Sequence, residues 1–281
     1  MRTHSLWRGT TPLIISVPHA GTALPEDLVP QLTPLAQTLA DTDWNVAQLY
    51  DFAPALGATV IAAHYSRYLI DLNRPPDDAA LYSAAPQTGL CPTLSFSGDP
   101  LYRDRPGGLT PTEVTRRRQL YWQPYHDELR ALLAAARAHF GYALLLDAHS
   151  ICSTVPRLFA GRLPDINIGT HQGQSCSPVI HTALAQQLDL TAPGSNAATQ
   201  WTHVFNGRFT GGYITRHYGQ PKDGVHALQI ELAQCAYMDE TVVTGEASET
   251  RPTFDALRAA PLQELLRRIV EALLSVPLKG A

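Results

Sequence analysis

Long apolar runs are missing from this 281-residue sequence. The longest, such as 13–17 and 143–146, are far shorter than the roughly 20 residues that a membrane-spanning helix needs. The first residues also lack the basic start, apolar core and small-residue cleavage site of a secretory signal peptide. The four cysteines form no Cys-x-x-Cys pair. We therefore expect a cytoplasmic protein with reduced thiols and no membrane partner.

The sequence also has no excess of positive charge. It contains 21 Lys and Arg against 25 Asp and Glu, a net charge of -4, and its isoelectric point is near 6.2. This balance disfavours nucleic acid as a partner, so any acidic ligand must be bound by local arginines. The motifs G-x-S-x-G, G-x-x-x-x-G-K-[ST], H-E-x-x-H and G-x-G-x-x-G do not occur. Ser150 remains an alternative as a catalytic nucleophile. Cys152 is more typical of a small core thiol than of a nucleophile.

Short apolar segments alternate with helical patterns along the chain. Strands are expected at 12–17, 59–62, 68–71, 142–146 and 226–232, and helices at 41–53, 110–140, 175–188 and 261–276. Pro124 should kink or split the second helix. No repeat or linker divides the chain, so we predict one domain over residues 1–281. Its fold should be three-layer α/β/α with a mixed, mostly parallel central sheet. Residues 82–108 are expected to form a functional loop.

Two histidines follow apolar strands, where α/β enzymes gather their chemistry. They are His19, in Pro-His-Ala-Gly, and His149, in Asp-Ala-His-Ser. Together with Asp43 they form a donor set for a divalent metal that keeps a position open for water. The alternative for the two histidines is a structural role. The alternative for Asp43 is a charge at the start of a helix, a position at which Asp41 would serve equally well. Asp147 lies two residues before His149 and could orient its imidazole.

Glu231 lies near the end of an apolar strand, where a carboxylate needs either a function or a partner. It is a candidate general base facing the metal's water, or else a paired structural carboxylate. Arg67, Arg74, Arg208 and Arg216 are candidates for binding carboxylates, because a guanidinium offers a planar, bidentate fork. Arg208 belongs to a glycine-rich segment whose backbone could close on an anion. A solvated arginine is the alternative for Arg67 and Arg216.

Six segments, taken in order, resemble those of the N-formylglutamate amidohydrolases, the N-formylglutamate deformylases of histidine degradation. They are spread over most of the chain, at 16–21, 41–44, 66–74, 147–150, 211–216 and 228–231. The family is in turn distantly similar to the zinc carboxypeptidases, which carry a histidine with an acid, Asn-Arg, His-Ser and a strand glutamate in this order. One departure is that Thr22 stands where the carboxypeptidase His-x-x-Glu has its glutamate. Asp43 as the replacing acid is an inference.

The resemblance implies a phosphorylase/hydrolase-like, zinc-carboxypeptidase-like fold and metal-dependent hydrolysis of N-formyl-L-glutamate to L-glutamate and formate. His19, Asp43 and His149 would bind one divalent ion, with zinc expected, and Glu231 and Arg67 would act in catalysis. The substrate is a small dianionic N-acyl amino acid, and the residues implied to bind it are Asn73, Arg74, Arg208, Arg216 and Gly212. Two alternatives remain: a related metal-dependent N-acyl amino acid deacylase or exopeptidase, and a non-catalytic protein that binds acidic metabolites. The oligomeric state is not predicted.

Overall fold

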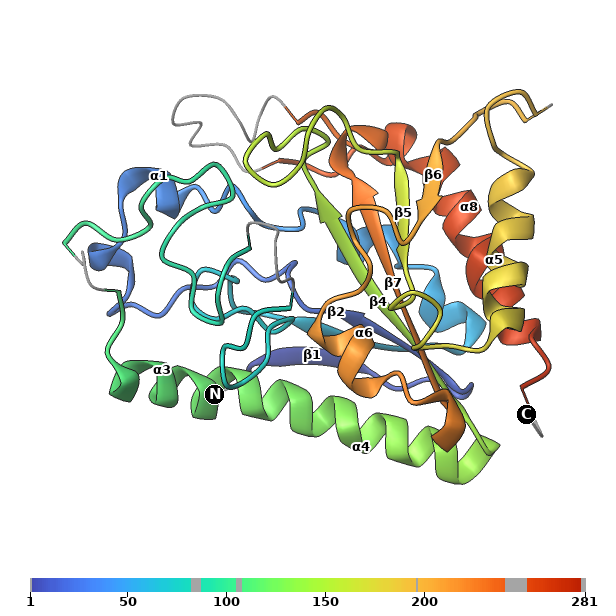
Figure 1. The fold of residues 1–281 in the computed structure, drawn as a ribbon, viewed down its shortest axis with the longest axis horizontal. Coiled ribbons are helices and arrows are strands. Elements are labelled where there is room, and N and C mark those ends of the chain that lie inside the picture. The colour runs from blue at the N-terminus through green and yellow to red at the C-terminus, as the bar shows by residue number, and fades with distance from the viewer. Residues whose placement is uncertain (1, 82–86, 105–107, 196, 241–251, 279–281) are drawn as a thin grey trace.

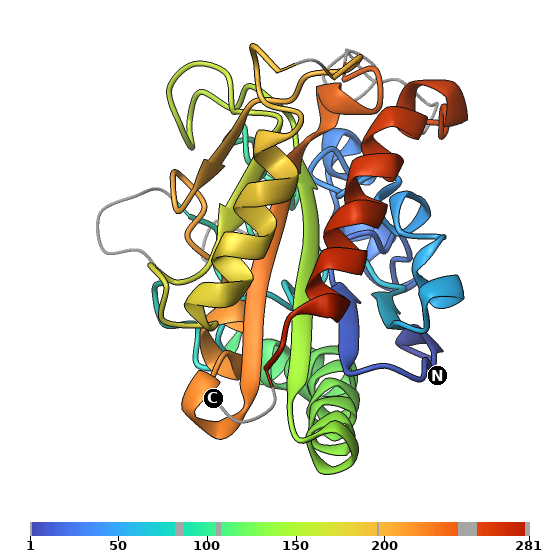
Figure 2. The same cartoon turned by 90° about the vertical axis from the view of Figure 1, so that its right-hand side faces the viewer.

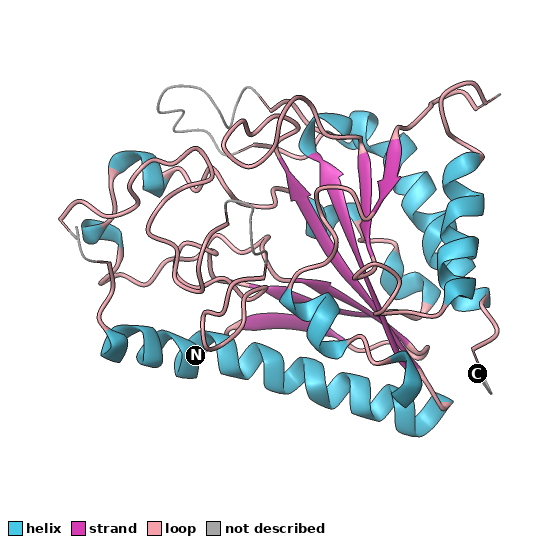
Figure 3. Ribbon diagram, viewed as in Figure 1, coloured by secondary structure: helices cyan, strands magenta, loops and turns pink. Residues whose placement is uncertain are grey.

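A mixed sheet forms the centre of the protein (Figures 1 and 3). The computed structural model describes residues 2–81, 87–104, 108–195, 197–240 and 252–278. Within these residues, seven strands lie in the order β1-β3-β2-β4-β7-β5-β6. Their bounds are β1 His4–Trp7, β2 Leu13–Val17, β3 Thr59–Ala63, β4 Ala143–Ile151, β5 Ile166–Gly169, β6 His203–Phe205 and β7 Val225–Ala233.

Four adjacent strands, β3, β2, β4 and β7, run parallel to one another. Strand β1 is antiparallel to β3, and β5 is antiparallel to β7 but parallel to β6. The prediction of a mixed, mostly parallel sheet is therefore confirmed. The carboxyl ends of the four parallel strands meet along one edge of the sheet, where α/β proteins place their ligands.

Helices cover both faces of the sheet, as predicted. In Figure 2, α5 and α8 lie side by side in front of the strands, and Figure 1 shows α4 running below the sheet, away from α5 and α8. Helices α4 and α6 pack on β4, whereas α2 packs against α8 and β4. The helices are α1 Pro34–Gln37, α2 Val46–Leu49, α3 Pro111–Arg117, α4 Gln123–Phe140, α5 Pro178–Asp189, α6 Tyr213–Tyr218 and α8 Ala256–Ser275. Single 3₁₀ turns lie at Val29–Gln31, Ala53–Leu56, Pro221–Asp223 and Gln234–Ala236.

The helix expected over 110–140 is interrupted. A π-helical turn at Arg118–Trp122 separates α3 from α4. It lies just before Pro124, which has no N–H to donate to the carbonyl four residues earlier. Helix α8 starts earlier than predicted, at Ala256, because the Asp255 side chain accepts hydrogen bonds from two backbone N–H groups of its first turn.

Two sequence predictions of local structure were wrong. Residues 68–71 do not form a strand. A turn covers residues 67–69, because the Ser66 carbonyl accepts from the Leu69 N–H at 2.9 Å and the Ser66 hydroxyl accepts from the Tyr68 N–H at 3.2 Å. The helix expected over 41–53 is reduced to α2 and begins after Asn45, which adopts a positive φ of 61°. Asp43 therefore lies in a coil before this helix and not in its first turn.

Strands β4 and β7 are buried along their whole lengths. They belong to a core that draws on residues from Leu13 to Leu278, in keeping with the single domain we propose. Polar side chains in such strands need partners, because an unpaired buried charge is costly. His149 and Glu231 are directly opposed in the register of these two strands. None of the helices within the described ranges is long and apolar enough to cross a membrane.

Candidate active site

His19, Asp43 and His149 come together in one buried group. Each offers one ligand atom, and the three atoms lie within 4.8 Å of one another. His19 follows β2, and His149 lies inside β4, which extends past the predicted end of that strand. Asp43 is positioned by the tertiary structure, because its N–H donates to the His19 carbonyl at 3.1 Å and its carboxylate accepts from the Ser150 N–H at 3.1 Å.

The Nδ1 atoms of both imidazoles face the same oxygen of Asp43. His149 Nδ1 lies 3.0 Å from Asp43 Oδ2 and His19 Nδ1 lies 3.7 Å from it. Across the part of the chain that is described, His19 Nδ1 has no hydrogen-bond partner although it is buried. A metal ion satisfies such an atom, and two imidazole nitrogens with one carboxylate oxygen are a donor set that suits zinc. The residues present therefore fit one divalent ion.

The outer nitrogens of the two imidazoles donate to carboxylates. His19 Nε2 donates to Asp71 at 2.7 Å, and His149 Nε2 donates to Asp147 at 2.8 Å. In the neutral imidazoles these bonds place the ring proton on Nε2 and leave the Nδ1 lone pair directed inward, the arrangement usual around metal-binding histidines. Burial opposes a charge on His149, but Asp147 and Asp43 raise its pKa well above the ordinary value. The same negative field favours a bound cation.

Glu231 faces this group from β7. Its side chain is buried, and Gln229 Nε2 donates to its carboxylate at 2.8 Å. Burial raises the pKa of Glu231 to about 7, although the charge of His149 opposes the rise. Such a carboxyl can accept and return a proton near neutral pH. Sequence reasoning missed Gln229, although the strand period of two places it on the same face as Glu231.

Asn73 and Gly212 are packed against each other beside the histidines. Asn73 Nδ2 donates to Asp147 at 3.0 Å, and Asn73 Oδ1 accepts from the Ile214 N–H at 2.8 Å. The Gly212 N–H donates to Gln229 at 2.8 Å. A Cβ atom on residue 212 would lie only 2.4 Å from Asn73 Nδ2, so the backbone can approach this closely only as glycine.

Three of the four candidate arginines line a cavity that His19, His149 and Glu231 also line. Arg67 is buried, and its guanidinium lies 2.7 Å from Asp71 and 3.5 Å from Asp43. Arg74 donates to the Thr88 carbonyl at 2.7 Å. Arg208 donates to the Leu158 carbonyl at 2.9 Å.

Arg216 lies outside the lining of this cavity. Its guanidinium donates to the Gly211 carbonyl at 2.8 Å, to the Thr210 hydroxyl at 2.9 Å and to the Leu81 carbonyl at 3.0 Å. These acceptors belong to the loop that carries Gly212 and to a segment far away in the sequence. Arg216 thus connects the two segments.

Apart from Asp43 and Arg216, every site residue expected from the sequence lines one cavity of about 60 Å³ at the carboxyl ends of β2, β4 and β7. Asp43 lies beneath it, almost completely buried. Part of the segment expected to be a functional loop, including Thr88 and Phe96, also lines the cavity. Residues 82–86 and 105–107 of that segment lie outside the described residues.

A three-layer α/β fold with histidines, carboxylates and arginines gathered at the ends of parallel strands is typical of hydrolytic enzymes that act on small acidic substrates. The sequence profile of one such family, N-formylglutamate amidohydrolase, matches residues 11–238. The chain belongs to this family, and the resemblance seen in the sequence is confirmed.

Known proteins support this assignment along nearly the whole chain. An N-formylglutamate deformylase of Pseudomonas aeruginosa (strain PAO1) is 50% identical over 273 residues, which is 96% of each chain. One from Pseudomonas putida is 48% identical over 96% of this chain and 95% of its own. The crystal structure of N-formylglutamate amidohydrolase from Ralstonia eutropha JMP134 superposes with a TM-score of 0.77 at 26% identity, covering 98% of this chain and 97% of the other. The gene product Atu2144 of Agrobacterium tumefaciens shares the fold, with a TM-score of 0.69 at 18% identity, covering 98% of this chain and 95% of its own.

Proposed function

We propose that this protein is a metal-dependent deformylase that hydrolyses N-formyl-L-glutamate to L-glutamate and formate. The observation that carries the proposal is that the group of His19, Asp43 and His149 meets the buried Glu231 beside a cavity lined by arginines. The names of the related proteins from both Pseudomonas species support the same substrate. The proposed setting is cytoplasmic histidine degradation, the role implied by the family resemblance.

His19, Asp43 and His149 would hold one divalent ion, with zinc the expected one. When bound, this ion supplies Lewis acidity that acidifies a water and polarises the formyl oxygen. Glu231 takes the proton from the attacking water and gives it to the amide nitrogen as glutamate leaves. Its pKa of about 7 suits both steps at neutral pH. Asp71 and Asp147 hold the two imidazoles in the tautomer that this arrangement requires.

The arginines divide the remaining tasks. Among the arginines that line the cavity, Arg67 lies closest to the metal-binding group of His19, Asp43 and His149. It would stabilise the oxyanion that develops from the formyl oxygen. Arg74 and Arg208 would bind the two carboxylates of the substrate, because both line the cavity without contacting the metal-binding group. Arg216 would act on substrate indirectly, by holding the loop of Gly212. Asn73 would position Asp147 and His149 at the edge of the substrate pocket.

The test is a formate-release assay on protein stripped of metal by a chelator and then given zinc, cobalt or manganese. We expect activity to disappear with the metal and to return with it. A Glu231→Gln variant should bind metal as the wild type does but lose about 10² to 10⁴-fold in turnover. The proposal falls if chelator-treated protein keeps full activity, or if Glu231→Gln does.

A substrate panel separates this function from a related deacylase. It compares formyl-, acetyl- and succinyl-L-glutamate with formyl-L-aspartate, because one methylene changes specificity by roughly 10 to 200-fold. Faster hydrolysis of one of the other three compounds would reassign the substrate within the same chemistry. Binding of N-formyl-L-glutamate with no turnover under any metal would show a binding protein instead.

A further inference from the structure

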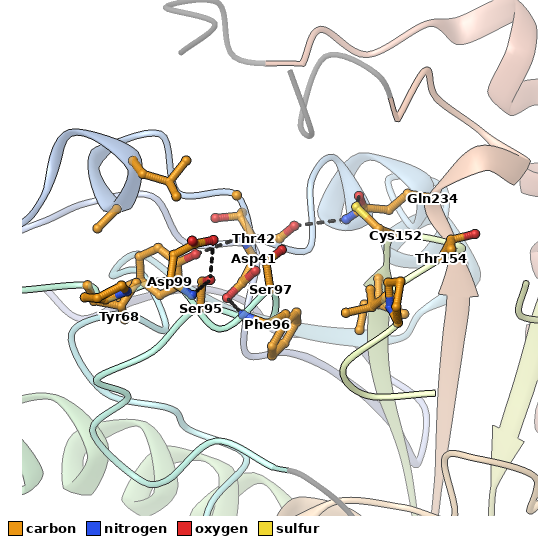
Figure 4. A pocket seen from close by; sticks show the side chains of 18 residues that line it. Asp41, Thr42, Tyr68, Ser95, Phe96, Ser97, Asp99, Cys152, Thr154 and Gln234 are labelled. Atoms are coloured by element: carbon orange, nitrogen blue, oxygen red, sulfur yellow. Dashed lines mark hydrogen bonds between the residues drawn. The ribbon is translucent and has the colours of Figure 1, made fainter. Parts of the chain in front are cut away.

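A second cavity adjoins the candidate active site (Figure 4). Its volume is about 310 Å³, against about 60 Å³ for the active-site cavity. The two cavities share only two of their lining residues, Phe96 and Ile151. Figure 4 shows the larger cavity between Asp41 and Ser95 on one side and Cys152 and Thr154 on the other. Phe96 and Ile151 therefore form the wall between the two spaces.

The wall is built into the metal-binding region. Ile151 ends β4, two residues after His149, so their side chains leave the strand on the same face. The Phe96 ring lies over the Arg67 guanidinium, 4.6 Å from its carbon atom to the ring centroid. The Phe96 backbone N–H donates to Asp41 Oδ2 at 2.7 Å. Both wall side chains are buried, so contacts on both sides fix the wall.

The two sides of the wall differ in net charge. Three arginines, Arg67, Arg74 and Arg208, line the active-site cavity beside the single carboxyl of Glu231 and are absent from the lining of the second cavity. Asp41 and Asp99 line the second cavity and are absent from the first. The carboxylates of a dianionic substrate are attracted to the arginines and repelled from the side of the aspartates. The acyl end of such a substrate therefore points toward the wall.

We propose that Phe96, with Ile151 beside it, determines the acyl specificity of this enzyme. The proposal rests on the deformylase function given above. The wall stops the acyl pocket at the size of a formyl group and separates it from a largely apolar space that is big enough for a short acyl chain. A longer chain meets the Phe96 ring in the wild type and enters the second cavity once that ring is removed.

The experiment compares N-formyl-, N-propionyl- and N-butyryl-L-glutamate as substrates of the metal-loaded wild type and of Phe96→Ala. The measured quantity is the ratio of kcat/KM for the butyryl and formyl substrates. This ratio cancels any general loss caused by removing the ring from Arg67. We expect it to rise at least about tenfold in Phe96→Ala. The inhibition constant of N-butyryl-L-glutamate against deformylation should fall as well in Phe96→Ala. This constant reports the opening of the wall through binding alone.

Two further variants make the test specific. Leu35→Ala is the matched control, because Leu35 lines the second cavity but neither the active-site cavity nor the wall, and it should leave the ratio at the wild-type value. Ile151→Ala opens the same wall and leaves the Phe96 ring in place, so its ratio should rise in the same direction even if Phe96→Ala does not fold.

Two outcomes overturn the proposal. One is an unchanged ratio in both wall variants, and the other is an equal rise in Leu35→Ala. Failure of the proposed function is a separate result, because it shows as absence of formate release by the wild type itself.

Discussion

A single methyl group at residue 212 is predicted to disable the site without touching a predicted metal ligand. In Gly212→Ala the new Cβ would lie 2.4 Å from Asn73 Nδ2, whereas an ordinary contact needs about 3.4 Å or more. Asn73 must therefore move by about 1 Å. Its hydrogen bonds to Asp147, at 3.0 Å, and from the Ile214 N–H, at 2.8 Å, are then stretched beyond a useful length.

The magnitude follows from the bonds lost. A hydrogen bond to a charged group contributes about 1.5 to 3 kcal/mol, and a neutral one about 1 kcal/mol. Because part of this is recovered by relaxation, we expect a loss of about 2 kcal/mol in the free energy of unfolding. Asp147 accepts a hydrogen bond from His149, so the displacement also reaches the proposed metal site. A misplacement of about 1 Å at a catalytic group costs about 100-fold in kcat/KM.

The assay is formate release together with urea unfolding, and Gly141→Ala is the matched control. Gly141 has a φ of 86°, so alanine there is strained by about 1 kcal/mol, but its Cβ would meet no atom within 4 Å. The control should lose stability and keep full activity. The reasoning is refuted if Gly212→Ala and Gly141→Ala have the same kcat/KM.

Three further predictions concern other parts of the molecule. Asp147→Asn removes the carboxylate that His149 Nε2 donates to, so metal affinity should fall about 10 to 100-fold in a chelator competition; an unchanged affinity would contradict this role. Arg216→Ala and Arg216→Lys should both lose activity, because lysine cannot reach the three acceptors; rescue by lysine would show that charge alone matters. Burial lowers the pKa of His126 to about 3, against 6.5 in an unfolded chain. Unfolding therefore takes up a proton between these values, and stability is lost as the pH falls below about 6.5, by about 2 kcal/mol from pH 7 to pH 5. In urea titrations, the free energy of unfolding of His126→Gln should not fall by this amount between pH 7 and pH 5. An equal fall in the variant and the wild type would contradict the role given to His126.

The family resemblance and the main strands were accessible from the sequence alone. Strands β2, β4 and β7 are continuous apolar runs, which is the pattern of a parallel sheet covered on both faces. A polar residue inside or just after such a run stands out, and for this reason His19, His149 and Glu231 could be named as candidates. Each of these inferences uses residues that are neighbours along the chain, so the physics behind them is local.

Asp43 shows where local reasoning stops. Its sequence neighbours indicate a helix start, but the His19 carbonyl and the Ser150 N–H hold it beside the two histidines. Asp71 belongs to one of the segments that carry the family resemblance, but the sequence implied no role for it. Its contacts with His19 and Arg67 appear only in the folded chain. Arg216 resembled a substrate ligand in its motif, but it lies outside the lining of the active-site cavity and its guanidinium holds the loop of Gly212.

The sequence by itself therefore determined the family, the layered α/β architecture and the identity of the residues at the strand ends. Only the tertiary structure decided that Asp71 orients His19, that His149 and Glu231 oppose each other in register, and that Phe96 and Ile151 separate two cavities. The physical reason is the range of the interactions. Hydrophobic periodicity and turn chemistry act over a few residues, whereas strand register, buried ion pairs and cavity walls join residues that are dozens of positions apart.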